Sequence, residues 1–301
     1  MATLYSEQSK NVRKTWFLMT MFAGIVVLIG WFVSYYYGNP SILTFAIIFA
    51  VLMNVVSYWK SDKIALSLAR AVPAKREEHL ELFQIAENLS ITAGIPMPRL
   101  YIINDPAPNA FATGRNKEHA AVAVTTGLLN IMDKNELSGV IAHEFSHITN
   151  RDILLQSVVV VLVGFIAIIG NSFMHMHMFG GRRRESGGNA GNILMIVGVV
   201  FMILSPIIAQ LIQLAISRKR EFLADSSGAL LTRFPEGLAS ALQKISAYGQ
   251  PLQTANNATA HMYISNPFGV KAKQGISKLF MTHPPVQERV NALLGTKDQI
   301  S

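Results

Sequence analysis

The sequence predicts a mostly α-helical protein with a small β-sheet, an α+β fold in which transmembrane helical hairpins carry a soluble domain. Four long apolar stretches are spaced along the 301 residues, and short strand patterns alternate with helical patterns between residues 77 and 150. Charged residues make up 15% of the chain, whereas soluble proteins contain roughly 25%. These observations favour membrane segments joined to one modest soluble domain.

The first two apolar stretches predict an N-terminal transmembrane hairpin over residues 1–59. They cover about Thr15–Tyr37 and about Ser41–Trp59 and carry no charge, and each is close to the ~20 residues that cross a bilayer. Lysines and arginines precede the first stretch and follow the second, whereas the turn between them is uncharged. This asymmetry places both outer ends of the hairpin in the cytoplasm.

The third and fourth stretches predict a second hydrophobic hairpin over residues 153–216. They cover about Ile153–Phe173 and about Ile193–Ile216, and a glycine-rich linker that contains Arg182–Arg184 joins them. If both stretches cross the membrane, this arginine cluster lies outside, against the positive-inside rule. Full spanning is the favoured interpretation, and a hairpin that dips into the membrane or lies against the first remains the alternative.

Two polar segments, residues 60–152 and 217–301, are expected to form one soluble domain. Asp133 is a good helix N-cap, and Glu136 is placed to complete a capping box. The other expected elements are a helix from Glu77 to about Thr92, strands at Arg99–Ile103 and His119–Thr125 with a loop at Asn109–Gly114 between them, and helices near Pro235–Ile245 and Val286–Leu294.

The helix that follows Asp133 contains the string His143-Glu-Phe-Ser-His147. Side chains four residues apart share one face of a helix, so both imidazoles can bind one metal ion. Glu144 lies beside them and can accept a proton from the water that attacks a substrate. Zinc suits two histidines and a carboxylate, with one position left open.

The third metal ligand is expected to be Glu221. A histidine six residues after His147 is absent, because Ile153 occupies that position. Among the downstream glutamates, Glu221 begins a segment that we expect to continue the fourth apolar helix. Asp225, four residues later, shares its face and can orient a ligand histidine through a hydrogen bond.

The composition excludes several classes of site and partner. The chain has no cysteine, so disulfides, thiolate metal sites and a cysteine nucleophile are excluded. The net charge is +8, but many positive residues flank the apolar stretches and none of the common nucleic-acid-binding patterns is present. We therefore expect the lipid bilayer as a partner and no nucleic acid; the sequence does not set the oligomeric state.

Taken together, these motifs resemble those of the HtpX-type membrane metalloproteases, a gluzincin family related to the CAAX prenyl endopeptidases. The resemblance covers nearly the whole chain. It rests on Asn109-Ala-Phe-Ala-Thr-Gly114, Thr125-Thr-Gly-Leu-Leu129, His143-Glu-Phe-Ser-His147 with Asn150-Arg-Asp152, Arg220-Glu-Phe-Leu-Ala-Asp225 and Thr282-His-Pro-Pro285.

The resemblance implies a gluzincin-like catalytic domain that faces the cytoplasm of a bacterial inner membrane and binds one zinc ion per chain. It also implies protein substrates, namely misfolded or damaged membrane proteins that are cleaved in quality control under stress. His283 is the candidate donor to the oxyanion, and a structural role in its proline-bounded loop is the alternative. The strand at His119–Thr125 is expected to pair with extended substrate, unless it is a buried structural strand.

Three alternatives remain open. A CAAX-type peptidase would require prenylated substrates, although four apolar stretches are few for a large enclosed chamber. A metal-binding membrane scaffold or transporter would not need Glu144, and the four stretches contain no charged residue of the kind that lines transport pathways. His175 and His177, at the end of the third stretch, either mark a helix end at the membrane surface or bind a soft metal such as copper.

Overall fold

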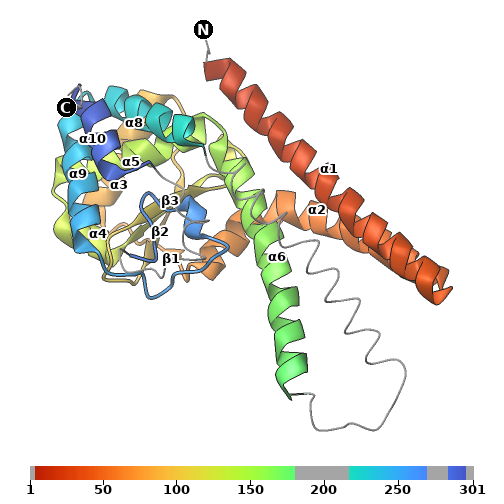
Figure 1. Ribbon diagram of the computed structural model, residues 1–301. Helices are drawn as coiled ribbons and strands as arrows, with labels where there is room; N and C mark the ends of the chain where they lie inside the picture. Colours follow the sequence, from red (N-terminus) through yellow and green to blue (C-terminus); the bar gives the residue numbers. More distant parts are fainter. Residues whose placement is uncertain (1–3, 180–216, 270–283, 296–301) are drawn as a thin grey trace, which may run out of the picture.

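Two long antiparallel helices form the N-terminal hairpin, and the other elements gather beside its open end (Figure 1). The computed structural model describes residues 4–179, 217–269 and 284–295. Helix α1 (Leu4–Tyr37) and helix α2 (Pro40–Leu68) are both long and apolar enough to cross a membrane, counting α1 from Gln8. Both extend beyond the predicted apolar stretches, α1 at its start and α2 at its end.

The turn between α1 and α2 is set by three consecutive residues. Gly38 has a φ of +62°, a left-handed conformation that glycine adopts without strain. Asn39 caps α2, because its side-chain oxygen accepts a hydrogen bond from the Ser41 amide at 3.0 Å. Pro40 then takes the first helical position, where the lack of an N–H costs nothing. This local chemistry explains the sharp reversal at the end of the hairpin that lies far from the soluble domain.

The small sheet has the strand order β1-β2-β4-β3. Strand β2 (Arg99–Ile103) runs parallel to β4 (Ala121–Thr125), whereas β1 (Val72–Pro73) pairs antiparallel with β2, and β3 (Ala110–Thr113) pairs antiparallel with β4. All residues of β4 are buried, because both of its edges and both of its faces are covered. The prediction that residues 119–125 form a substrate-binding edge strand is therefore wrong; β3 is the edge strand on this side of the sheet.

Strand β3 occupies most of the segment that was predicted as a loop, Asn109–Gly114. Phe111 and Thr113 favour a strand, whereas Ala110 and Ala112 do not, so the local preference is weak. The pairing Phe111↔Ala123 and its neighbours in the register supply the hydrogen bonds that hold the segment extended. Tertiary pairing thus overrides local propensity here.

The sheet separates two apolar clusters. Ala121 and Ala123 of β4 face the cluster formed with the base of the hairpin and with helix α6 (Asp152–Phe179). Val122 and Val124 face the cluster formed with helices α3 (Leu80–Ala93), α5 (Lys134–Thr149) and α9 (Pro235–Tyr248). This alternation is the two-residue period of a strand. The sheet therefore lies between the cluster that packs on the hairpin and the cluster that packs on the helix with the histidine motif.

The helices of the soluble domain pack on the second cluster. They are α3 (Leu80–Ala93), α4 (Thr126–Ile131), α5 (Lys134–Thr149), α8 (Arg218–Thr232), α9 (Pro235–Tyr248) and α10 (Val286–Leu294), with 3-10 turns η1 (Lys117–His119) and η2 (Ala260–Met262). Helix α3 begins three residues later than predicted, and the bounds of α10 are those predicted. Figure 1 shows α8 and α9 beside α5, and α10 beside α8 and α9.

Helix α5 carries the histidine motif and has the predicted capping box. The Asp133 carboxylate accepts hydrogen bonds from the amides of Asn135 and Glu136, and the Glu136 carboxylate accepts one from the Asp133 amide. The helix ends at Thr149, and the chain then bends by 85° into α6. At the bend Arg151 has a φ of +58°, which stops the helix before α6 begins.

Helix α6 (Asp152–Phe179) contains the third apolar stretch. Its first half is buried against α1, α2 and the sheet; the buried apolar residues are Ile153, Leu154, Leu155, Val158, Val159, Val160, Val161, Leu162, Val163 and Ile166. The fourth apolar stretch, and with it the second half of the predicted hairpin over residues 153–216, lies outside the described residues. Helix α8 does not continue that stretch in the way predicted, because Ser217 is extended and the helix begins at Arg218.

Two glycines allow helices to approach α5 closely. A Cβ atom on Gly228 of α8 would lie 3.0 Å from the His143 amide nitrogen, and one on Gly139 of α5 would lie 2.7 Å from the Leu238 amide nitrogen of α9. Such contacts are tighter than side-chain carbons normally make. The small residues therefore bring α8 and α9 against the motif helix, and α8 carries Glu221.

Candidate metal centre and active site

His143, His147 and Glu221 come together from α5 and α8, although they lie far apart in the sequence. One ligand atom from each residue lies within 4.8 Å of the others. The two Nε2 atoms are 3.2 Å apart, and the Glu221 carboxylate lies 3.9 Å from His143 Nε2 and 3.7 Å from His147 Nε2. All three side chains are buried.

This set of atoms fits a zinc ion. Two neutral imidazole nitrogens and one carboxylate are a common three-ligand set for catalytic zinc, which leaves one coordination position for water or substrate. The two Nε2 atoms point toward each other, and a cation between them and the carboxylate satisfies all three. The chain offers no thiolate, so the hard and borderline ligands present favour zinc over a soft metal.

Each ligand imidazole is oriented by a carboxylate at its other ring nitrogen. Asp225 Oδ1 lies 2.9 Å from His143 Nδ1, and Asp152 Oδ2 lies 3.0 Å from His147 Nδ1. A carboxylate at Nδ1 fixes the tautomer that leaves Nε2 for the metal and makes the nitrogen a stronger ligand. The expected contact of Asp225 is present in the structure. The matching role of Asp152 was missed, because this residue lies beyond the end of the motif helix.

The two imidazoles titrate differently. Burial lowers the pKa of His143 to about 4, with Arg289 and His147 acting in the same direction against the opposing effect of Asp225. Burial also acts to lower the pKa of His147, but Asp152, Glu221 and Glu144 outweigh it and raise that pKa to about 9. The difference reflects the local charge: the Arg289 guanidinium opposes Asp225 beside His143, whereas three carboxylates act together on His147.

Glu144 lies beside the ligands with a strongly perturbed carboxyl group. Burial raises its pKa to about 7, and Glu221 adds to this effect, whereas His147, the Ala112 backbone amide and Arg289 oppose it. Within the described residues neither carboxylate oxygen has a hydrogen-bond partner. A buried carboxyl group with a pKa near neutrality and free oxygen atoms is suited to exchange a proton with a substrate or with water.

Arg289 is a site residue that sequence reasoning missed. Its guanidinium donates to both Asp225 oxygens at 2.8 and 2.6 Å and lies 3.5 Å from His143 Nδ1, and the residue is 1% exposed. It shares one helix face with Val286, Val290 and Leu293. That apolar spacing places Arg289 on the buried face of α10 and is the pattern that could have revealed it.

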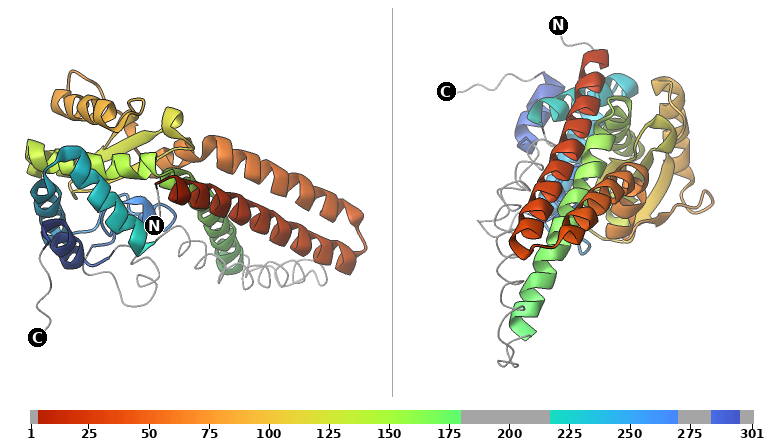
Figure 2. Two further views of the ribbon diagram at one scale, coloured as in Figure 1. Left: turned by 90° about the horizontal axis from the view of Figure 1, so that it is seen from above. Right: turned by 90° about the vertical axis from the view of Figure 1, so that its right-hand side faces the viewer.

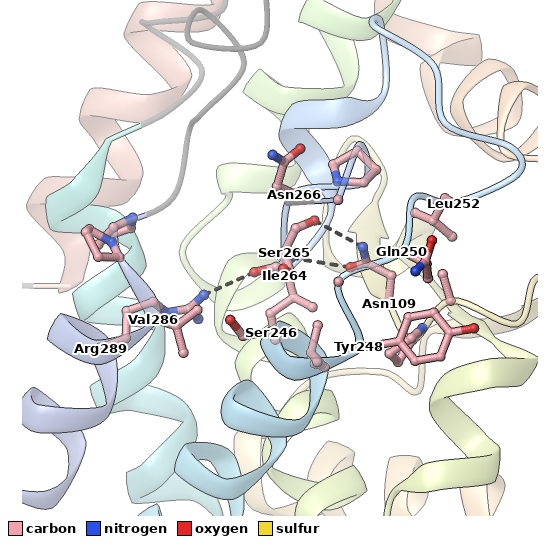
Figure 3. A pocket seen from close by; sticks show the side chains of 18 of the residues that line it. Asn109, Ser246, Tyr248, Gln250, Leu252, Ile264, Ser265, Asn266, Val286 and Arg289 are labelled. Carbon is pink, nitrogen blue, oxygen red and sulfur yellow. Dashed lines mark hydrogen bonds between the residues drawn. The ribbon is translucent and has the colours of Figure 1, made fainter. Parts of the chain in front are cut away.

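A cavity of about 410 Å³ is lined in part by Arg289. Figure 3 shows Arg289 donating to the Ile264 carbonyl, and the Asn109 side chain forming two hydrogen bonds with the Ser265 backbone. The wall contains Tyr248 and Leu252 beside polar groups. The cavity therefore has mixed apolar and polar walls next to the candidate metal centre.

Two predicted sites fall where the structure gives no side-chain position. His283 lies outside the described residues, which resume at Pro284 on the wall of the cavity. His175 and His177 are within α6, but their side chains lie outside the described ones. The structure therefore brings together His143, Glu144, His147, Glu221 and Asp225 of the predicted residues.

Comparison with known proteins gives the family. The sequence profile of peptidase family M48 matches residues 76–297. Proteins named "Protease HtpX homolog" from Caldanaerobacter subterraneus and Thermoanaerobacter pseudethanolicus are 47% and 48% identical, each over 97% of both chains. The crystal structure of S. mikatae Ste24p superposes with a TM-score of 0.46 at 17% identity, and the match covers 97% of this chain and 66% of that one. The family profile and the near full-length relatives show that this chain belongs to peptidase family M48, and it is a membrane-associated zinc metalloprotease.

Proposed function

We propose that the protein hydrolyses peptide bonds of misfolded or damaged membrane proteins at the cytoplasmic surface of the bacterial inner membrane. His143, His147 and Glu221 are the zinc ligands in this proposal, and Glu144 is the general base. The observation that carries it is the convergence of two imidazoles and a carboxylate beside a buried carboxyl group whose pKa is raised to about 7.

Each residue has a defined task in this reaction. When bound, zinc supplies Lewis-acid chemistry, which polarises a carbonyl group and makes water a nucleophile at neutral pH. Glu144 accepts a proton from the attacking water on a carboxylate oxygen and delivers it to the leaving amine. Asp225 and Asp152 hold the two imidazoles in position, and Arg289 holds Asp225.

The edge of β3 supports binding of an extended peptide beside Glu144. Backbone groups alternate in direction along an antiparallel strand, and Ala110 O already points outward to accept a hydrogen bond from Ile264 N. Ala112, two residues later, therefore also presents its N–H and C=O outward, and its amide lies close enough to Glu144 to affect that carboxyl group. Pairing through the backbone tolerates many sequences, which suits clearance of damaged proteins.

Backbone methylation tests this mode of binding. A peptide substrate methylated at the amide that pairs with Ala112 should show a raised KM, whereas methylation at the neighbouring position should have little effect. Equal KM values for methylation at every position would contradict pairing along β3.

The orientation of the hairpin supports a cytoplasmic active site. The positive residues Lys10, Arg13 and Lys14 lie near the start of α1, Lys60 and Lys63 lie in the last turns of α2, and both ends meet the soluble domain (Figure 1). The positive-inside rule assigns this side to the cytoplasm. Because the chain has no cysteine, a single cysteine at exposed Glu118 should react with an impermeant thiol reagent only in inverted vesicles. Labelling in intact spheroplasts would reverse the assignment.

His283 remains the candidate donor to the oxyanion, because it directly precedes Pro284 and Pro285 at the wall of the cavity beside Arg289. Removal of one such donor lowers kcat by about 10²–10³-fold in other proteases. His283→Ala is expected to lower kcat on that scale with little change in KM and in zinc content. A change in thermal stability without a change in kcat would assign His283 a structural role.

The central test compares wild type, Glu144→Gln and Glu221→Ala in detergent solution. We expect Glu144→Gln to keep its zinc and lose cleavage of casein, and Glu221→Ala to bind zinc more weakly. Glu118→Gln, an exposed residue with the same change in charge, is the matched control and should retain both properties. Proteolysis by Glu144→Gln at the wild-type rate would end the proposed mechanism, and strict dependence on a prenylated peptide would favour a CAAX-type activity.

A further inference from the structure

The first turns of α1 extend beyond the apolar stretch and reach the junction of α5 and α6. Gln8 donates to the Thr149 carbonyl at 2.7 Å, and Asn11 donates to the Asn150 carbonyl at 3.2 Å and to Asp152 Oδ1 at 2.6 Å. Figure 2 shows the start of α1 beside α6. The N-terminal membrane helix is therefore in contact with the end of the helix that carries both candidate histidine ligands.

Asn11 is well placed to recognise Asp152. It is 2% exposed, although it lies among the charged residues Lys10 and Arg13. A buried amide is costly unless its polar atoms are paired. Here the nitrogen donates to two acceptors, and the oxygen accepts a hydrogen bond from Arg220 at 3.3 Å. The side chain thus joins α1, α6 and α8 at one point.

Asp152 divides its two oxygens between the membrane helix and the metal centre. Oδ1 accepts from Asn11, and Oδ2 lies 3.0 Å from His147 Nδ1. Arg220 Nε lies 3.7 Å from Oδ1, on the same side as Asn11. With Oδ1 fixed by Asn11, the direction of Oδ2 is fixed as well, and with it the ring plane of His147.

We propose that Asn11 is a positioning residue for the metal centre, which acts through Asp152 on His147. Zinc affinity then depends on the docking of the N-terminal membrane helix onto the catalytic domain. The inference rests on His147 as a zinc ligand, which the proposed function also assumes, but it is independent of the substrate class. If wild type did not bind zinc, both the proposed function and the inference about Asn11 would be wrong. If wild type binds zinc but substitution of Asn11 leaves the affinity unchanged, only the inference about Asn11 is wrong.

Zinc affinity of the full-length chain tests the proposal. We expect Asn11→Leu to weaken zinc binding about 10–100-fold in chelator competition, the range seen when groups that orient a metal ligand are lost. The absorption spectrum of the cobalt-substituted protein should change as well, because it reports the geometry of the ligands. Gln8→Leu is the matched control: it removes a hydrogen bond at the same surface that does not involve Asp152. It should bind zinc within about twofold of wild type.

A double-mutant cycle with Asp152→Asn separates action through Asp152 from a general loss of packing. If Asn11 acts through Asp152, Asn11→Leu has little further effect on zinc affinity in the Asp152→Asn background. Any of three results would overturn the proposal. Asn11→Leu could keep the wild-type zinc affinity and an unchanged cobalt spectrum. Gln8→Leu could lose as much zinc affinity as Asn11→Leu, or the losses of zinc affinity could be additive in the double variant. If Asn11→Leu does not fold, Asn11→Ser, which is too short for the Asp152 contact, takes its place in every arm.

Discussion

The guanidinium of Arg289 is a fork that matches both oxygens of Asp225, and a lysine cannot reproduce it. We predict that Arg289→Lys weakens zinc binding about tenfold, because Asp225 then orients His143 less firmly. Chelator competition measures this effect. Arg76→Lys is the control. Two nitrogens of Arg76 also pair with the two carboxylate oxygens of Glu87, but Arg76 is exposed and is distant in sequence from the candidate ligands. Unchanged zinc affinity in Arg289→Lys would show that Asp225 needs no second partner.

Glu136 offers a prediction on stability and pH. Burial acts to raise its pKa, but Lys244, Ser240 and the Asp133 amide outweigh it, so the pKa lies below its usual value of 4.5. A carboxyl group whose pKa is lower in the folded than in the unfolded chain stabilises the protein at pH values above its unfolded-state pKa. This contribution is lost as the pH falls through the folded-state pKa.

Glu136→Gln should therefore lower the free energy of unfolding by about 1 kcal/mol at pH 7, and the difference from wild type should shrink below about pH 4. Glutamine keeps an oxygen for the Asp133 amide, so the capping interaction is largely retained. Denaturant unfolding at pH 7 and at a pH well below 4 measures the difference. A loss that is equally large at both pH values would mean that the charge of Glu136 is not its cause.

At the scale of elements, the helices with local end signals were predictable from sequence. The capping box of Asp133 and Glu136 set the start of α5, and Pro284 and Pro285 before Val286 set the start of α10. Such patterns act within a few residues, so no knowledge of the rest of the chain is needed. The same locality explains why the geometry of His143 and His147 could be expected before the fold was known.

The elements that depend on distant contacts were harder to predict. Strand β3 contains Phe111 between two alanines, and its extended form depends on pairing with β4. The polar start of α1 gave no indication of its contact with Asp152, because Asn11 lies among lysines and arginines that mark a membrane boundary. Patterns of composition describe what a segment prefers, whereas these contacts depend on which surface it meets.

The packing of α9 on α5 gives a prediction at this scale. Ala at Gly139 would place a Cβ atom 2.7 Å from the Leu238 amide nitrogen, and backbone atoms cannot rotate away as a side chain can. We expect Gly139→Ala to destabilise the protein by about 1–3 kcal/mol, the usual cost of overpacking. Gly24→Ala is the control, because a Cβ there meets nothing within 4 Å. Thermal unfolding of both variants measures the effect, and a stable Gly139→Ala would show that α9 can shift at little cost.

For the whole molecule, the candidate metal centre joins two segments that residues 153–216 separate in sequence. His143 and His147 lie on α5 before this region, and Glu221 lies on α8 after it. The two helices pack side by side, so the two ends of this region lie close together.

Zinc should therefore stabilise the fold as well as catalyse the reaction, since it links α5 to α8 across the two segments. A ligand that binds only the folded state stabilises it by about 2.7 kcal/mol at a concentration 100 times its Kd. For a folded unit of about 150–250 residues that corresponds to a Tm higher by roughly 5–10 °C. We predict that a chelator lowers the Tm of wild type by this amount and that added zinc restores it.

Two variants determine whether this effect comes from the proposed ligands. Glu144→Gln keeps all three ligands and should show the full loss of Tm on chelation. Glu221→Ala removes the ligand from α8, so its Tm should change little when the chelator is added. A fall in Tm as large in Glu221→Ala as in wild type would place the stabilising ion elsewhere, because the link between the two segments depends on that carboxylate.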